Sequence, residues 1–464
     1  MTTLTERIAA FTSALDYDGL PNEVREKCKV SLLHNLGMAV AGGPLLSPVL
    51  AYAQALGEGG SGASARLLLS GKAATPDTAA LVNAALTHSR AQDDVYFPGL
   101  THVGATISPA ILAVGEQLGS SGKELITALT AGYEAAGAIS QDFAKRTTAR
   151  GFRASGIFGV FGSAAGVARL LGLDATATAN TLGIAANMAA GTNQTWVAGT
   201  DEWQIQVGMA ARNGILAARL AAAGCSAAPD ALEGRAGFYT AFMGDLEQVA
   251  EVGKDLGTVW RSLDVTYKPY PVCAILQGPV REAIMFAGER QIKTEDIAAV
   301  RLMLPPAEAA YPGTDSKGPY KGTGAALMSS QFCLAVALAQ RRFKGADLRR
   351  LDDPTLKGLI HKIEVHPKLE LHARSFILEL DFADGQTFRR SFTPTGQPFN
   401  WERDEVTAQL QSMVDELPIG PKGLVQLCKV VLSAENHTAR QIVDACCTES
   451  AALTGGVAVR EEQI

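Results

Sequence analysis

Apolar residues recur at helical spacing through the first half of the chain. Leu125, Ile126, Leu129, Ala136 and Ile139 fall on one helical face, which predicts an amphipathic helix. The same spacing predicts further helices at Pro21 to Gly42, Thr75 to Leu86, Ile107 to Leu118, Phe158 to Leu171, Ala175 to Ala190 and Met209 to Ala223. Glycines follow several of these segments, where a left-handed cap is usual. The first half is therefore predicted to be helix after helix.

The pattern changes near Trp260, where the segment from Val265 to Pro271 carries two prolines. Beyond it, short β-like stretches are predicted at Ala299 to Leu304, Lys362 to His366, Phe376 to Phe382 and Thr387 to Phe392, the last two joined through Asp384-Gly385. Helices are expected between them at Gly324 to Ala339 and Pro354 to Ile360, and helical spacing returns from Trp401 to Ala445.

These changes predict a mainly α protein with two domains. Residues 1–264 and 400–464 are expected to form a large all-helical domain, because the last segment returns to the pattern of the first. Residues 265–399 are expected to form a smaller α+β domain. The chain has 464 residues, more than a single core usually organises.

Composition narrows the possible partners. The net charge is -6 and there is no long run of lysine or arginine. The chain therefore lacks the positive patch that binds nucleic acid or an anionic membrane. The N-terminus lacks the pattern of a secretory signal and no apolar run is long enough to cross a bilayer, so a cytoplasmic location is expected. Seven scattered cysteines without a Cys-x-x-Cys pair predict reduced thiols and no zinc or iron–sulfur site.

The most unusual local composition lies between two predicted helices, from His88 to His102. Its two histidines and the pair Asp93-Asp94 could relay protons, because imidazole titrates near neutrality and a carboxylate can tune it. A solvated loop that caps the following helix explains the aspartates equally well. A metal site is less favoured, because no compact ligand spacing is present.

Two further segments carry candidate chemistry. Lys145 to Gly156 places four cations, including Arg150 and Arg153, before a glycine-rich helix start, where a carboxylate or phosphate could bind; a charged surface loop is the alternative. Tyr267 to Gln277 places Lys268 between tyrosines and prolines at the domain junction. Lysine there could face a cleft as an acid, a base or an anion clamp, or belong to an ordinary linker.

Together these segments resemble the MmgE/PrpD family over nearly the whole chain. The resemblance is carried by Asn83-Ala-Ala-Leu-Thr-His88 with Asp93-Asp94, by Thr101-His102-Val-Gly-Ala, by Gly122-Lys-Glu-Leu with Ala131-Gly-Tyr-Glu134, by Arg150-Gly-Phe-Arg153-Ala-Ser-Gly156 with Phe161-Gly-Ser-Ala-Ala and Leu170-Leu-Gly-Leu-Asp174, by Gly208-Met-Ala-Ala-Arg-Asn-Gly214 and by Lys268-Pro-Tyr-Pro-Val-Cys273.

The resemblance implies a large helical domain, a smaller domain like chorismate mutase, a homodimer, and no metal or organic cofactor. It also implies an interdomain site that moves a proton next to a carboxylate of a small acid. The family pattern matches at His88, Asp93, Asp94, His102 and Lys268.

At other positions the chain departs from the family pattern. Ala91 stands where an aspartate is usual, Val95 where a threonine is usual, and Trp203 where a lysine is usual. Arg153 replaces a common histidine, and Gln277 lies near where many members carry another. Because an acid, a hydroxyl and a cation are lost, a tricarboxylate would leave buried charge unpaired. We expect a substrate with fewer carboxylates than methylcitrate, or a more apolar one that stacks on Trp203.

The sequence therefore predicts a cofactor-independent lyase, of dehydratase or decarboxylase type, acting on a small organic acid. His102 and Lys268 are the expected acid/base pair, with Asp93 and Tyr270 orienting them. Arg153 and Arg150 are expected to grip a carboxylate, while Ala91, Val95, Trp203, Gln277 and His88 are expected to line the substrate site. Two alternatives remain: an epimerase or isomerase that uses two bases, and a non-catalytic ligand-binding protein.

Overall fold

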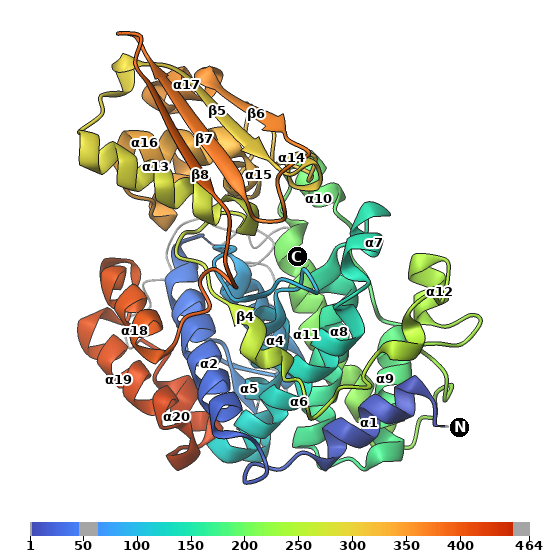
Figure 1. The fold of residues 1–464 in the computed structure, drawn as a ribbon. Coiled ribbons are helices and arrows are strands. Elements are labelled where there is room, and N and C mark those ends of the chain that lie inside the picture. Colours follow the sequence, from blue (N-terminus) through green and yellow to red (C-terminus); the bar gives the residue numbers. More distant parts are fainter. Residues whose placement is uncertain (1, 46–63, 449–464) are drawn as a thin grey trace, which may run out of the picture.

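A computed structural model of the chain describes residues 2–45 and 64–448. Its larger part is a bundle of closely packed helices (Figure 1). The main ones are α2 (Asn22–Gly42), α4 (Pro76–His88), α5 (Val103–Leu118), α6 (Gly122–Ser140), α8 (Ala154–Leu170), α9 (Ala175–Ala186) and α11 (Glu202–Ala222). The prediction of a helical first half is confirmed, and α1 (Leu4–Ala14) is a further helix that was not predicted.

Small residues let these helices approach closely. A Cβ on Gly132 of α6 would lie 2.7 Å from the backbone oxygen of Gly162 on α8, so neither helix tolerates a larger side chain at this crossing. The apolar faces of α2, α4, α5 and α6 share one core with the C-terminal helices. This packing fixes the start of α5 and α8, where candidate site residues lie.

The smaller part contains a four-stranded sheet in the order β6-β5-β7-β8. Strand β5 (Ile297–Leu304) runs parallel to β6 (Ile363–Pro367) and antiparallel to β7 (Phe376–Phe382), which pairs with β8 (Thr387–Phe392). Helices α13 (Gln277–Arg290), α16 (Ser330–Gln340) and α17 (Pro354–Lys362) pack against the sheet (Figure 1). The mainly α fold with a smaller α+β part is confirmed, whereas the likeness to chorismate mutase stays a prediction.

The chain returns to the helical part after β8. Helices α18 (Arg403–Ser412), α19 (Gly420–Leu432) and α20 (Ala439–Asp444) follow, and α18 and α19 pack beside α2 (Figure 1). The hydrophobic core of the helical part includes Tyr267, and that of the sheet part includes Val272. The change from one core to the other thus falls in the proline-containing segment, and the division into domains at residue 265 stays a prediction. Among the described helices, none is both long and apolar enough to span a membrane.

Several predicted boundaries were wrong. The expected helix from Gly324 to Ala339 is two helices, α15 (Thr323–Met328) and α16, because Ser329 is extended and its hydroxyl accepts the Phe332 amide at the start of α16. The helix expected from Met209 begins at Glu202 instead. Helix α13 was not predicted.

Candidate active site

A buried carboxylate, Asp93, joins the two histidines of the polar segment. Asp93 Oδ1 lies 2.8 Å from His88 Nδ1, and Asp93 Oδ2 lies 2.9 Å from His102 Nδ1. The histidine rings meet edge to face, with centroids 4.5 Å apart. One aspartate therefore orients both imidazoles.

Local structure explains how three residues far from one another along a loop meet. His88 ends α4, and His102 is the N-cap residue of α5. Between them, Ala91 adopts a left-handed backbone with φ of 48°, and the two-residue strand β3 (Val95–Tyr96) pairs with β4 (Val265–Thr266). The loop is thus held at both ends and at its middle.

Asp94 fastens the same loop to the helical core. Its carboxylate accepts the Gly104 amide in the first turn of α5 at 2.7 Å, the Tyr133 hydroxyl at 2.7 Å and the Asn35 amide at 2.9 Å. Asp93 and Asp94 are both fully buried. Asp94 does cap the following helix, but the alternative of a solvated loop is wrong.

Lys268 reaches the cluster from the segment after β4. It is 1% exposed, its ammonium donates to the Ala91 carbonyl, and Nζ lies 3.3 Å from His102 Nδ1. This burial and these contacts disfavour the alternative of an ordinary linker. The left-handed backbone at Ala91 presents the carbonyl that holds this lysine.

Arg153, the N-cap residue of α8, approaches from the opposite side of His88. It is 3% exposed, and its guanidinium donates to His88 Nε2, to the Trp203 carbonyl and to Gln206 Oε1. It also lies over the Trp196 ring at 5.0 Å. A guanidinium has five N–H donors. Because the three acceptors named here do not use all of them, Arg153 keeps donors for an anion.

The charges and hydrogen bonds define one protonation pattern. Burial alone would raise the pKa of Asp93, but His88, His102 and Lys268 outweigh it and hold that pKa well below its usual value. Burial lowers the pKa of His102 to about 4, with a further lowering from the Lys268 charge, and burial lowers that of His88 to about 3. Both imidazoles are then neutral at pH 7 and donate from Nδ1 to the Asp93 carboxylate.

This pattern distinguishes the two histidines. His88 Nε2 faces Arg153, and the His88 side chain is 1% exposed. The His102 side chain is 18% exposed, and no hydrogen bond to His102 Nε2 occurs among the described residues. His102 therefore offers an open lone pair, whereas His88 is held on both nitrogens.

The donor set also decides between a metal ion and an anion. Ligand atoms of His88, Asp93 and His102 lie within 4.8 Å of one another, a grouping that could hold a cation. However, both Nδ1 atoms are turned onto the carboxylate, and the cations of Lys268 and Arg153 flank the group. Two fixed positive charges disfavour a third and favour an anion.

Trp203 is fully buried inside α11 and cannot be reached as an exposed stacking surface. Its ring contacts His88 with centroids 4.9 Å apart and Trp196 at 5.3 Å. A Cβ on Gly324 of α15 would lie 2.6 Å from Trp203 Nε1. Trp203 thus supports His88 and contacts the smaller part of the molecule in this conformation.

Other predicted residues lie away from the cluster. Arg150 is exposed and sits over Phe152. Gln277 uses its side-chain amide on the backbone of Tyr270 and Val272, and within the described part of the chain no hydrogen bond joins the Tyr270 hydroxyl to Asp93 or His102. Val95 contributes its carbonyl, which accepts the Thr266 hydroxyl. The structure therefore gathers Asp93, His102, Lys268, Arg153, His88, Ala91 and Trp203, and it does not bring the other four to them.

Sequence reasoning missed the residues that support the cluster from a distance. Asn35 and Tyr133 hold Asp94, while Trp196 and Gln206 hold Arg153. Of these four residues, only Trp196 could have been suspected from the sequence, because it is a second tryptophan within a few residues of Trp203.

Fold and site together define a mainly helical protein with a smaller α+β part, whose buried histidine–aspartate pair lies between two cations. Comparison with known families agrees: the MmgE/PrpD N-terminal domain matches residues 6–249 and the MmgE/PrpD C-terminal domain matches residues 270–411. The chain belongs to the MmgE/PrpD family.

Curated relatives carry one activity in their names. A cis-aconitate decarboxylase of Aspergillus terreus is 26% identical over 84% of this chain and 84% of its own length. The cis-aconitate decarboxylase of Homo sapiens is 30% identical over 42% of this chain and 41% of its own. A cis-aconitate decarboxylase-like protein of Aspergillus oryzae is 28% identical over 42% of this chain and 43% of its own.

Proposed function

We propose that this chain is a lyase that acts next to a carboxylate of a small organic acid, with His102 as the base and Lys268 as the acid. The observation that carries the proposal is the open Nε2 of a neutral His102. Asp93 fixes Nδ1 of the same ring, and Lys268 Nζ lies 3.3 Å from that Nδ1. A neutral imidazole oriented by a carboxylate is a competent base.

In a dehydration, His102 Nε2 removes the proton from the carbon beside the carboxylate. The electron pair forms the carbon–carbon double bond, and the carbon–oxygen bond on the next carbon breaks. The Lys268 ammonium gives its proton to the departing hydroxyl, which leaves as water. After these transfers Lys268 is neutral, and the positive charge lies on the His102 imidazolium and on Arg153, where it stabilises the negative charge of the carboxylate.

Decarboxylation is a second candidate, favoured by the names of the relatives. Here the bond to a carboxylate carbon breaks, carbon dioxide leaves, and the electron pair stays on the substrate. A proton from the Lys268 ammonium then replaces the lost group. Because Ala91 and Trp203 supply neither charge nor a hydroxyl, we propose a substrate with fewer carboxylates or a more apolar body than a tricarboxylate.

Further features belong to the same proposal. Lys268 and Arg153 supply fixed positive charge, so the reaction needs no metal or organic cofactor. His88 and Asp93 act as positioning residues. A homodimer and a cytoplasmic location complete the proposal.

The test is turnover of a panel of 3-hydroxy acids and cis-aconitate, followed by enoate absorbance and by trapping carbon dioxide. H102N and K268M should each lower kcat by about 100-fold or more, the usual contribution of a positioned acid or base. H366N is the matched control, because His366 lies on β6 and is 44% exposed; its activity should equal that of the unmodified chain.

Other outcomes would reject the lyase assignment. Full activity in H102N would exclude His102 as the base. Deuterium uptake from D2O into recovered substrate, without loss of water or carbon dioxide, would identify an epimerase or isomerase. Saturable binding of an acid that is never converted would identify a ligand-binding protein.

A further inference from the structure

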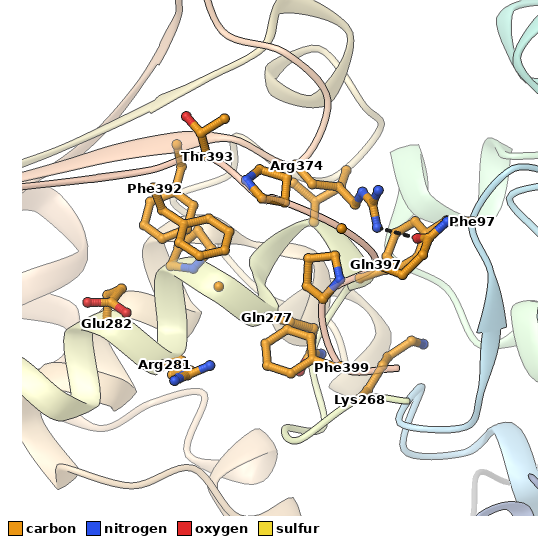
Figure 2. A pocket seen from close by; sticks show the side chains of 18 of the residues that line it. Phe97, Lys268, Gln277, Arg281, Glu282, Arg374, Phe392, Thr393, Gln397 and Phe399 are labelled. Carbon is orange, nitrogen blue, oxygen red and sulfur yellow. Dashed lines mark hydrogen bonds between the residues drawn. The ribbon is translucent and has the colours of Figure 1, made fainter. Parts of the chain in front are cut away.

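A cavity adjoins Lys268 but is not lined by the rest of the cluster. It has a volume of about 300 Å³ and lies between the start of α13, the end of β8 and the segment from Thr393 to Phe399. His102, Asp93 and Arg153 do not line it. Figure 2 shows the Lys268 ammonium pointing away from Phe392 and Arg281. The cavity is therefore separate from the active site, although the two share one residue.

Aromatic rings form much of the cavity wall. Phe97, Phe392 and Phe399 line it (Figure 2). Phe376 lines it as well, and its ring stacks with that of Phe392 with centroids 5.4 Å apart. A cavity of this volume with a mostly apolar wall and a few polar groups is typical of a small-molecule site. Its apolar wall requires a ligand with an apolar body.

Two arginines add positive charge at the edge of this wall. Arg374 lies over the Phe97 ring at 4.8 Å and donates to Gln397 Oε1 at 2.7 Å, while Arg281 lies over the Phe399 ring at 6.0 Å. Among the described residues, neither guanidinium has a carboxylate oxygen within 4 Å. Both cations are thus available to a carboxylate, which a guanidinium binds in a bidentate manner.

Two acidic residues near the cavity offset only part of this charge. Glu282 lines the same wall, but its carboxylate lies 3.8 Å from Arg390 Nε. Glu308 accepts the main-chain amide of Arg374 and attracts its guanidinium, but it does not line the cavity. The first turn of α13 also faces the cavity, through Gln277, Gly278 and Pro279, and no side chain caps that helix end. The positive end of the helix adds to the two arginines.

We propose that this cavity binds an aryl-alkyl monocarboxylate, with its ring among the four phenylalanines and its carboxylate between Arg281 and Arg374. The wall supplies apolar contact for one end of such a molecule, and the arginines supply charge for the other. The four phenylalanines and the two arginines take no part in the proposed lyase chemistry, although Lys268 also lines the cavity.

Titration of the full-length chain with 4-phenylbutyrate, followed by calorimetry, tests the proposal. Binding should be saturable, and the R281M/R374M variant should weaken it by about tenfold or more, the usual effect of losing charged hydrogen bonds. R290M is the matched control, because Arg290 lies at the other end of α13 over Phe286; its affinity should not change. H102N should also bind normally.

A second comparison needs no variant and covers the case in which R281M/R374M does not fold. The uncharged 4-phenylbutanol should bind the unmodified chain at least about tenfold more weakly than the acid. Equal affinity for the acid and the alcohol, unchanged binding in folded R281M/R374M, or absence of saturable binding would overturn the proposal. Loss of binding in H102N would place the acid in the active site instead.

Discussion

At the scale of single residues, Arg153 gives two histidines that share the Asp93 carboxylate different roles. Asp93 fixes Nδ1 of both, but Arg153 occupies Nε2 of His88 whereas Nε2 of His102 stays open. Neither the spacing of the histidines nor their neighbours in sequence contains this difference, because Arg153 is 65 positions from His88. The choice of His102 in the sequence came from a family resemblance, and the hydrogen bonds now supply a physical reason for it.

Arg153 and Arg150 provide a matched pair for the anion-binding proposal. R153M should raise KM about 10- to 100-fold, the usual effect of losing charged hydrogen bonds, because Arg153 is buried beside the cluster. R150M should leave KM unchanged, because Arg150 is exposed. R153K separates charge from geometry and should recover part of the loss. Steady-state kinetics of the three variants would contradict the proposal if R150M and R153M behaved alike.

At the scale of helices and strands, the sequence predicted most of the long helices because their apolar spacing is local information. The sequence could not predict that Ser329 would be the N-cap residue of a new helix, α16, because serine fits both a helix interior and a helix cap. The β7–β8 hairpin was predicted from Asp384-Gly385, and Gly385 has the left-handed φ of 85° that this turn requires. The packing of Trp203 against α15 depends on two segments far apart in sequence and was not predictable.

The first turn of α5 is the element on which the site depends most. A Cβ on Gly104 would lie 1.9 Å from Asn35 Nδ2 and 2.6 Å from Asp94 Oδ2. G104A should therefore break the Asp94 network, lower the free energy of unfolding by about 1–3 kcal/mol, and reduce kcat by displacing His102.

The matched control is G358A in α17. A Cβ there meets nothing within 4 Å, and alanine favours a helix over glycine by about 1 kcal/mol. G358A should thus raise the melting temperature while G104A lowers it. Equal melting temperatures for G104A and the unmodified chain would show that the Asp94 network does not hold α5.

At the scale of the whole molecule, the two-part organisation was predictable because the hydrophobic period changes where the chain passes into the sheet. The position of the site was less predictable from the sequence, because α4, α5, α8 and the segment after β4 must converge to form it. Burying polar groups at this convergence affects the stability of the entire fold. Burial lowers the pKa of His88, and that of His34, a fully buried residue of α2, to about 3. It lowers the pKa of His102 to about 4 and raises that of Asp94 to about 6.

These shifts predict how stability depends on pH. Between pH 4 and 6 the unfolded chain protonates the three histidines, whereas the folded chain keeps them neutral and protonates Asp94, so unfolding takes up a net of about two protons from these groups. The free energy of unfolding should then fall by about 2.7 kcal/mol per pH unit as the pH decreases. Urea titrations at pH 4 to 7 would measure this slope, and constant stability across that range would contradict the buried neutral histidines.

The central claim is that His102 is a neutral base with an open Nε2, and NMR of 15N-histidine-labelled protein tests it without knowledge of the substrate. The His102 signals, assigned by their loss in H102N, should show a proton on Nδ1 and none on Nε2 at pH 7. They should not titrate until the pH falls to about 4. A His102 ring that carries its proton on Nε2, or that titrates near pH 6.5, would contradict the account.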